Sequence, residues 1–190
     1  SMECIRENYP RDVFYNLMNV VGTHDTARAL TLLGVTENEW KMDRNGRAHY
    51  QLPPDRLEIA LRRLRMAAVI QFTMPGSPTI YYGDEADQEL LAFYRKLCEI
   101  RAEEQTLADG DLQFSDTTAG ALLRYERTSG DSRLVIVVNR GHQYAETKID
   151  ALYALDLLSG EGFAYADPDG LIVSVPPETA YILRCVNAVD

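Results

Sequence analysis

The spacing of apolar residues in residues 55–72 is the feature that most limits the folds open to this chain. The residues that recur at spacings of four and three are Leu57, Leu61, Leu64, Ala68 and Phe72. Such spacing places them on one face of a helix. Short apolar segments precede and follow this helix at residues 20–21 and 79–82, and a second amphipathic helix follows over residues 90–100. Strand, helix, strand, helix is the order of successive βα units, so we expect two parallel strands.

The ends of the first long helix carry their own signals. Asp55 followed three residues later by Glu58 predicts a capping box at its start, with Asp in the place of Ser or Thr. Pro75-Gly76 and Pro78 predict its end. We also expect a short helix over residues 11–19 and an irregular polar segment over residues 34–54.

The pattern changes at Gly110, where helical spacing gives way to short strands and turns. Ser129-Gly130-Asp131 is a hairpin signal between two of these strands. The candidate strands cover residues 121–127, 133–139, 144–148, 154–158, 171–175 and 180–185. Short strands at regular spacing predict an antiparallel β-sandwich. The expected fold class is therefore α/β plus all-β, with one domain over residues 1–109 and a sandwich domain over residues 110–190.

Length limits the first domain. A complete barrel of eight βα units needs roughly 250 residues, whereas this chain has 190 in total. Residues 1–109 have room for about two such units, so the chain cannot be a whole barrel.

Composition excludes several classes of partner. The chain has 29 Asp and Glu against 19 Lys and Arg, a formal net charge of −10, and no basic stripe in its sequence. This balance argues against binding to nucleic acid or to an anionic membrane surface. No apolar run approaches the roughly 18 residues of a membrane span. Three widely spaced cysteines and the absence of an apolar leader favour a reducing, cytoplasmic location.

The histidines and cysteines do not predict a metal site. His49 and His142 have no companion ligand at a suitable spacing, and no close pair of cysteines occurs. We therefore expect no metal and no cofactor in this segment.

Residues 22–28 form the first candidate site, because His24 and Asp25 follow directly on an apolar strand. Active sites of βα barrels are built at the carboxyl ends of the strands. A carboxylate there can stabilise developing positive charge, and a histidine can donate to a substrate hydroxyl. The competing interpretation is a strand-end turn whose Asp caps the next helix.

Residues 74–85 form the second candidate site, which ends in Tyr82-Gly83-Asp84-Glu85. Adjacent residues on an extended chain point to opposite faces, so Asp84 and Glu85 are a poor acid and base pair for one another. The competing interpretation is that one of these carboxylates holds the architecture at the end of the strand.

The order of these motifs resembles the C-terminal part of the α-amylase superfamily, glycoside hydrolase family 13. The resemblance rests on His24-Asp25-Thr26 with Arg28, on the Pro75-Gly76 to Asp84-Glu85 motif about 50 residues later, and on the helix over residues 90–101. Among its members, the neopullulanase, cyclomaltodextrinase and maltogenic amylase types are the most similar. The resemblance implies that the two strands are the seventh and eighth of a barrel.

The resemblance also implies roles for individual residues. His24 would bind sugar hydroxyls at the cleavage subsite, and Asp25 would be the third acidic residue, which stabilises the transition state. Arg28 lies one turn further on, among the substrate-binding candidates but with a structural role favoured. Gly83 and Asp84 would shape the floor of the site, and Tyr82 and Asp84 are among the substrate-binding candidates. The substrate would be an α-glucan or malto-oligosaccharide.

The sequence departs from the family in two ways. The nucleophile and the acid/base of a retaining glycosidase belong to motifs that precede the seventh strand, and nothing before His24 matches them. The segment after Ala86 is also shorter than in relatives. We therefore expect this chain to be a fragment of a retaining α-1,4-glucan hydrolase. It would carry one of the three catalytic acids and would be inactive alone. Calcium binding is known in the family but has no predicted ligands here.

Two other functions stay open at this stage. The first is a non-catalytic carbohydrate-binding module, in which aromatic residues of the sandwich, or Trp40, would stack on sugars. The second is an amylase-like scaffold protein that has lost catalysis. In each case the two strands would leave unpaired edges if no further barrel strands cover them, so we expect self-association through these edges.

Overall fold

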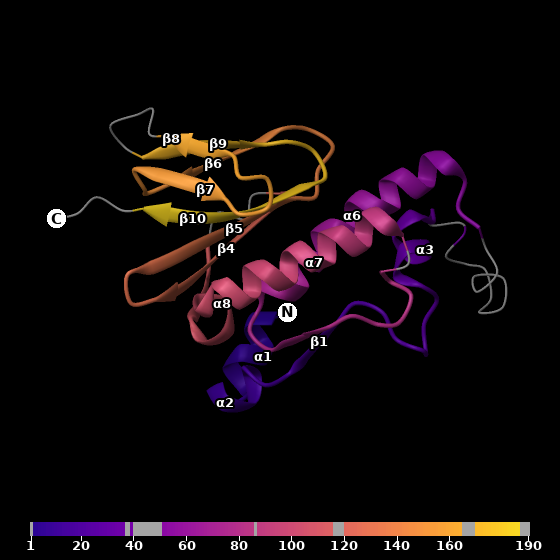
Figure 1. The fold of residues 1–190 in the computed structure, drawn as a ribbon, viewed down its shortest axis with the longest axis horizontal. Coiled ribbons are helices and arrows are strands. Elements are labelled where there is room, and N and C mark those ends of the chain that lie inside the picture. The colour runs from indigo at the N-terminus through magenta and orange to yellow at the C-terminus, as the bar shows by residue number, and fades with distance from the viewer. Residues whose placement is uncertain are drawn as a thin grey trace.

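The computed structural model describes residues 2–36, 39, 51–85, 87–115, 120–164 and 170–186. The helices are α1 (Met2–Asn8), α2 (Arg11–Phe14), α3 (Ala29–Gly34), α6 (Pro54–Thr73), α7 (Gln88–Glu103) and α8 (Gln105–Asp109). The strands are β1 (Met18–Val20), β2 (Ser77–Thr79), β3 (Asp111–Phe114), β4 (Leu122–Ser129), β5 (Ser132–Asn139), β6 (Ala145–Ile149), β7 (Tyr153–Asp156), β8 (Gly162–Ala164), β9 (Leu171–Val175) and β10 (Thr179–Val186). In Figure 1, α6 and α7 run side by side between the β1 segment and the layer of later strands.

Strands β1 and β2 pair in parallel, with Met18 opposite Ser77 and Val20 opposite Thr79. The predicted order of strand, helix, strand and helix is confirmed, with α3 and α6 between the two strands. The second strand lies at Ser77–Thr79 rather than at residues 79–82. The partner strand β1 sets this limit. Because β1 ends at Val20, the residues that follow Thr79 have no backbone groups to pair with.

Helix α6 confirms the apolar face but not the predicted cap. Leu64, Ala68 and Phe72 are buried, whereas Leu57 in the first turn is 38% exposed. The helix begins at Pro54, and Pro53 at its N-cap makes no side-chain capping bond, so the capping box of Asp55 is wrong. A proline in the first turn loses nothing, because its missing N–H would have no helical partner there. Helix α2 is also shorter than the predicted 11–19.

Every terminal carbonyl of α6 is hydrogen-bonded, each by a different part of the chain. The acceptor and donor pairs are Ile70 O with Met74 N, Gln71 O with Asn19 Nδ2, Phe72 O with Arg101 Nη1 and Thr73 O with Arg127 Nη1. The last four carbonyls of a helix have no intrahelical partner and must be satisfied in this way when buried. The end of α6 is therefore fixed by β1, α7 and β4 together.

The later strands form two antiparallel sheets. Six strands lie in the order β3-β4-β5-β10-β7-β8, and β6 pairs with β9 in a second sheet. All six predicted strands are present with shifted ends, and β3 and β8 are additional. Both additional strands lie at the edges of the larger sheet and have only four and three residues. Such short segments show too little alternation of apolar and polar residues to be predicted as strands.

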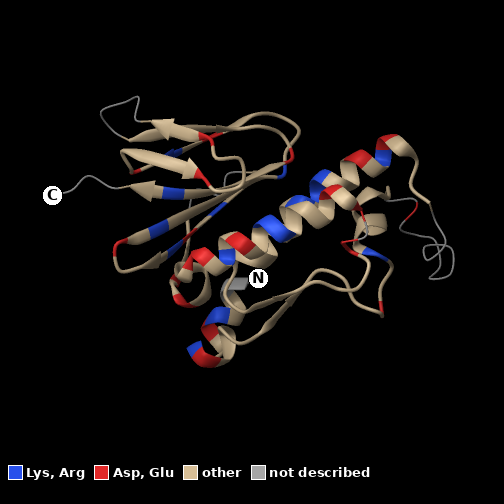
Figure 2. Cartoon of the chain, viewed as in Figure 1, with Lys and Arg blue, Asp and Glu red and all other residues tan. Residues whose placement is uncertain are grey.

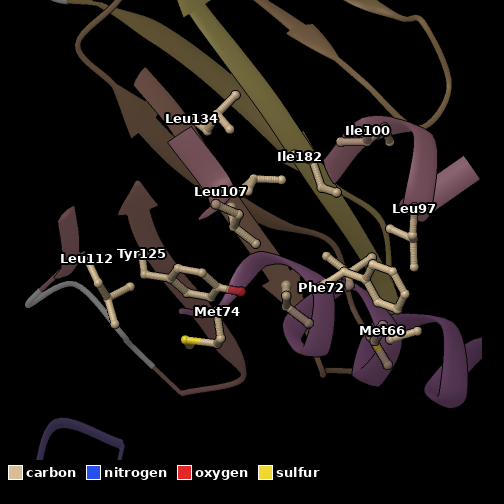
Figure 3. Close-up of a cluster of buried hydrophobic side chains, with 14 of the residues drawn as sticks. Met66, Phe72, Met74, Leu97, Ile100, Leu107, Leu112, Tyr125, Leu134 and Ile182 are labelled. Atoms are coloured by element: carbon tan, nitrogen blue, oxygen red, sulfur yellow. The ribbon is translucent and has the colours of Figure 1, made fainter. Parts of the chain in front are cut away.

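Both faces of the six-stranded sheet are covered. Along β5, Leu134, Ile136 and Val138 pack towards the helices, whereas Val135 and Val137 pack towards β6 and β9. Figure 3 shows the first cluster, in which Phe72 of α6 and Leu97 of α7 approach β-strand residues such as Tyr125 and Ile182. Residues on both sides of Gly110 therefore share one core, and the division into domains 1–109 and 110–190 stays a prediction.

Candidate functional site

The His24–Asp25 pair and the Tyr82–Asp84 segment follow the carboxyl ends of β1 and β2. Because these strands are parallel, both segments leave the two-stranded sheet at the same edge. This is the arrangement that the sequence predicts for the two motifs.

His24 and Asp25 are open to solvent. Their side chains are 80% and 74% exposed, and Nε2 of His24 lies 3.4 Å from Oδ1 of Asp25. The Asp25 backbone N–H donates to Oγ1 of Thr23 at 3.3 Å. Helix α3 begins at Ala29 with Arg28 at its N-cap and no side-chain capping bond. The competing interpretation of Asp25 as the cap of this helix is therefore not supported.

Arg28 joins the two segments. Its Nη1 donates to the backbone oxygen of Tyr82, and its guanidinium carbon lies 5.4 Å from the ring centre of Tyr81 and 5.8 Å from that of Tyr82. Gly83 has φ +91°, and a Cβ there would come within 2.8 Å of Arg28 Nη1. Glycine at this position lets the guanidinium lie against the backbone, so Arg28 supports the shape of the site.

Asp84 is buried, with 5% of its surface exposed, and its carboxylate lies against the backbone of Gly22, where a Cβ would approach Oδ2 to 2.8 Å. Burial raises the pKa of Asp84, the charge of Arg28 acts against this rise, and the charge of Glu85 adds to it. A buried carboxylate that contacts the other segment fits the interpretation that Asp84 holds the architecture.

Asp84 and Glu85 differ in their partners, although not for the predicted reason. Residues 82–85 form a turn rather than an extended strand, so alternation of side chains does not apply. Instead, Oε2 of Glu85 accepts a hydrogen bond from the Gly83 amide at 2.9 Å, while Asp84 lies against Gly22.

A pocket of about 590 Å³ lies beside this turn and is lined by residues that include Arg28, Tyr82 and Asp84. Tyr82 is 81% exposed, so its ring offers an apolar face to a ligand, with a hydroxyl at its tip. His24 and Asp25 are not among the lining residues of this pocket. The structure thus brings Arg28, Tyr82 and Asp84 together and places His24 and Asp25 in the neighbouring loop.

Two amide side chains behind the site, the half-buried Asn19 and the buried Gln71, are not singled out by the sequence patterns. The Gln71 side chain donates to Asn19 O at 2.9 Å and to Thr79 O at 2.8 Å. The Asn19 side chain donates to Pro75 O at 2.9 Å. The sequence offered one signal, the polar Gln71 near the apolar end of a predicted helix. A polar residue at such a position does not reveal which groups it bonds to.

Several other predictions lie elsewhere. Trp40, His49 and Ala86 lie outside the described residues, whereas His142 is exposed in a bend after β5. Among the described residues no group of three or more His, Cys, Asp or Glu could hold a metal ion. In that same part of the chain no helix has the length and apolar character to cross a membrane. Figure 2 shows acidic and basic residues interspersed along α6 and α7.

No family model matches the chain, but individual proteins do. An amylopullulanase of Thermoanaerobacter thermohydrosulfuricus is 33% identical over 89% of this chain and 13% of its own length. A cyclomaltodextrinase of Geobacillus thermopakistaniensis is 28% identical over 97% of this chain and 31% of its own length. The chain therefore spans less than a third of these relatives.

Solved structures share the fold. The α-amylase of Anoxybacillus has a TM-score of 0.77 at 20% identity, covering 99% of this chain and 41% of that chain. The α-amylase of Geobacillus thermoleovorans has a TM-score of 0.73 at 20% identity, covering 99% and 42%. With the motifs at residues 22–28 and 74–85 and the order of elements, these similarities show that the chain belongs to the α-amylase superfamily and matches a C-terminal part of such an enzyme.

Proposed function

We propose that this chain is the part of a retaining α-1,4-glucan hydrolase that holds the sugar at the point of cleavage. The observation that carries the proposal is the exposed His24–Asp25 pair at the carboxyl end of β1, beside the segment that carries Tyr82 after the parallel strand β2. The names of the relatives, amylopullulanase and cyclomaltodextrinase, support a starch-like substrate. In this proposal, β1 and β2 with their helices are the last two βα units of a barrel.

Each residue of the site has a role in the proposal. The Asp25 carboxylate faces the sugar ring and stabilises the positive charge that develops on it as the glycosidic bond breaks. The His24 imidazole donates to a sugar hydroxyl. The exposed Tyr82 ring packs on the substrate. Arg28 and Asp84 keep the two segments together, because one bonds to Tyr82 O and the other lies against Gly22.

Bond cleavage with retention needs two further carboxylates, a nucleophile and an acid/base about 5–5.5 Å apart. Asp84 is buried and Glu85 accepts from a backbone amide, so neither meets this need. We infer that the nucleophile and the acid/base belong to polypeptide outside these 190 residues. The chain alone then binds glucan weakly and does not hydrolyse it.

Binding and turnover test the proposal separately. Maltotriose titrated into the isotope-labelled chain should shift the signals of His24 and Tyr82, and Asp25→Asn and His24→Ala should weaken the binding. Asp131→Asn and His142→Ala change the same residue types at exposed positions and should leave binding unchanged. Equal effects of the two pairs, or no binding at all, contradict the proposal.

The second measurement incubates the chain with maltotriose, a cyclodextrin and an aryl maltoside. We expect no turnover above background. Turnover that disappears in Asp25→Asn would show that a second carboxylate of this chain is the nucleophile, and the assignment of a single catalytic acid would be wrong.

A further inference from the structure

We propose that Asn19 and Gln71 are positioning residues for the site, which fix β1, β2 and the end of α6 relative to one another. The proposal deepens the proposed function, because it says what holds the two segments that present His24 and Tyr82. Neither residue contacts the sugar in this proposal. They act through the strands that carry the site. We call the side chains of Asn19 and Gln71, with their hydrogen bonds, the amide clamp.

The Gln71 side chain is one half of the amide clamp. It lies on α6 with 5% of its surface exposed, and its Nε2 donates to Asn19 O in β1 and to Thr79 O at the end of β2. Only the nitrogen end of the amide can face these two atoms, because both are acceptors and an amide oxygen would be repelled by them. One side chain of α6 therefore holds both strands.

The Asn19 side chain is the other half. Its Nδ2 donates to Pro75 O at 2.9 Å and to Gln71 O at 3.3 Å, both near the end of α6. Gly76, with φ +112°, folds closely over it, since a Cβ at Gly76 would come within 2.9 Å of Asn19 Oδ1. The middle residue of β1 is thus tied to the segment that leads from α6 into β2.

The strands themselves give little control over their register. Each has three residues in the ladder, and a short pair of strands is only marginally stable without side-chain support. A slip of one residue would reverse the direction of every side chain in the strand. His24 lies five residues after Asn19, and Asp84 lies five residues after Thr79, so any such slip displaces both segments of the site.

The amide clamp also carries a cost that simple packing would avoid. The Oε1 atom of Gln71 is buried and has no hydrogen-bond partner among the described residues. An unsatisfied buried acceptor is unfavourable, so an apolar side chain of similar size would remove a penalty at this position. The amide adds two directed hydrogen bonds, one to β1 and one to β2. This favours a role of Gln71 in positioning the two strands over a role in filling the core.

The test compares two variants of the same helix. Gln71→Leu keeps the size of the side chain and removes both bonds to the strands. Thr73→Val removes a buried hydroxyl two residues further on, which contacts Val69 O and the Tyr125 hydroxyl, both at 2.6 Å. Both changes perturb the end of α6, but Thr73 points to the six-stranded sheet and the amide clamp points to β1 and β2.

The measurements are made on the full chain without sugar, so they do not depend on the proposed substrate. Nuclear magnetic resonance follows the His24 imidazole and the Gly22 and Gly83 amides. Hydrogen exchange follows the Ser77 amide, which donates to Leu17 O at 2.7 Å. In Gln71→Leu we expect the site signals to move and the Ser77 amide to exchange about tenfold faster or more, as two bonds that hold the strands are lost.

In Thr73→Val the same site signals and the Ser77 exchange rate should stay as in the parent chain, even where both variants unfold at similar urea concentrations. The proposal is overturned if the site signals and the Ser77 rate are unchanged in Gln71→Leu. It is also overturned if Thr73→Val moves them equally, because the effect would then follow loss of stability alone. A failure to bind maltotriose would contradict the proposed function and leave these outcomes intact.

Discussion

Replacing Arg127 with methionine tests how the helices are joined to the six-stranded sheet. The Arg127 side chain is fully buried in β4, yet it is charged and, among the described residues, it donates to backbone oxygens rather than to a carboxylate. Its Nη1 donates to Thr73 O at 2.6 Å and its Nη2 donates to Gly110 O at 2.9 Å. Burial lowers the pKa of Arg127 to about 10, because removing a charged group from water is unfavourable.

The magnitude follows from these two bonds. A hydrogen bond from a charged donor contributes about 1.5–3 kcal/mol, and the two together about 3–6 kcal/mol. Methionine removes the cost of burying the charge, which offsets part of this loss. Gly110 O keeps a bond from the Tyr15 hydroxyl at 2.8 Å, whereas Thr73 O is left without its donor. We therefore expect Arg127→Met to lower the free energy of unfolding by about 2–4 kcal/mol.

Urea unfolding followed by circular dichroism measures this difference. With a slope of about 3 kcal/mol per molar urea for a chain of this size, the midpoint should fall by about 1 M. Arg95→Met, at an exposed position on α7, is the matched control and should change the free energy of unfolding by less than about 0.5 kcal/mol. A midpoint for Arg127→Met equal to or above that of the parent chain would show that the buried charge costs more than its bonds return.

Three further predictions concern other parts of the chain. Burial alone would raise the pKa of Glu178, but hydrogen bonds from two arginines of α6 outweigh it and hold this pKa below its usual value. Glu178→Gln should therefore cost about 1–3 kcal/mol at pH 7. Thermal melts should show the difference shrinking as the pH falls through the folded-state pKa. Asn139 is fully buried at the end of β5, and its Nδ2 lies 2.8–3.0 Å from the carbonyl oxygens of Gln143, Val175 and Pro176. Asn139→Ala removes this donor, and a loss of about 2–4 kcal/mol should lower the melting temperature by roughly 4–16 °C. An unchanged melt would refute this role of Asn139. Met18 is 66% exposed on β1, which has one strand neighbour in the described part of the chain. We expect light scattering to show self-association that depends on concentration and that Met18→Lys reduces. A strictly monomeric parent chain would contradict this.

Local patterns in the sequence determined much of the fold. The apolar spacing of residues 57–72 identified α6, and the turn signal at residues 129–131 identified the hairpin of β4 and β5. These features depend on residues that are near one another in the chain, where helical period and turn chemistry act directly. The two candidate motifs also lay where the sequence placed them, because both follow apolar strands that pair in parallel.

Contacts between distant segments decided the rest. Strand β2 lies at Ser77–Thr79 rather than at residues 79–82, because its ladder depends on the short partner strand β1. The predicted Asp55 cap was wrong for a local reason, since the helix begins at Pro54 with Pro53 at its N-cap. Arg127 looked like an ordinary strand residue in the sequence, and its burial became visible only when Thr73 and Gly110 were brought to it.

The same reason explains Gln71 and Asn19. A polar side chain is buried only where donors and acceptors from elsewhere in the chain meet it, and no periodicity within one element records those partners. Patterns in the sequence predicted α6, α7, most of the later strands and the end of the parallel strands that carries His24 and Asp25. The contacts that hold this end in place are visible only in the folded chain, since the hydrogen bonds that form them join residues about 50 positions apart.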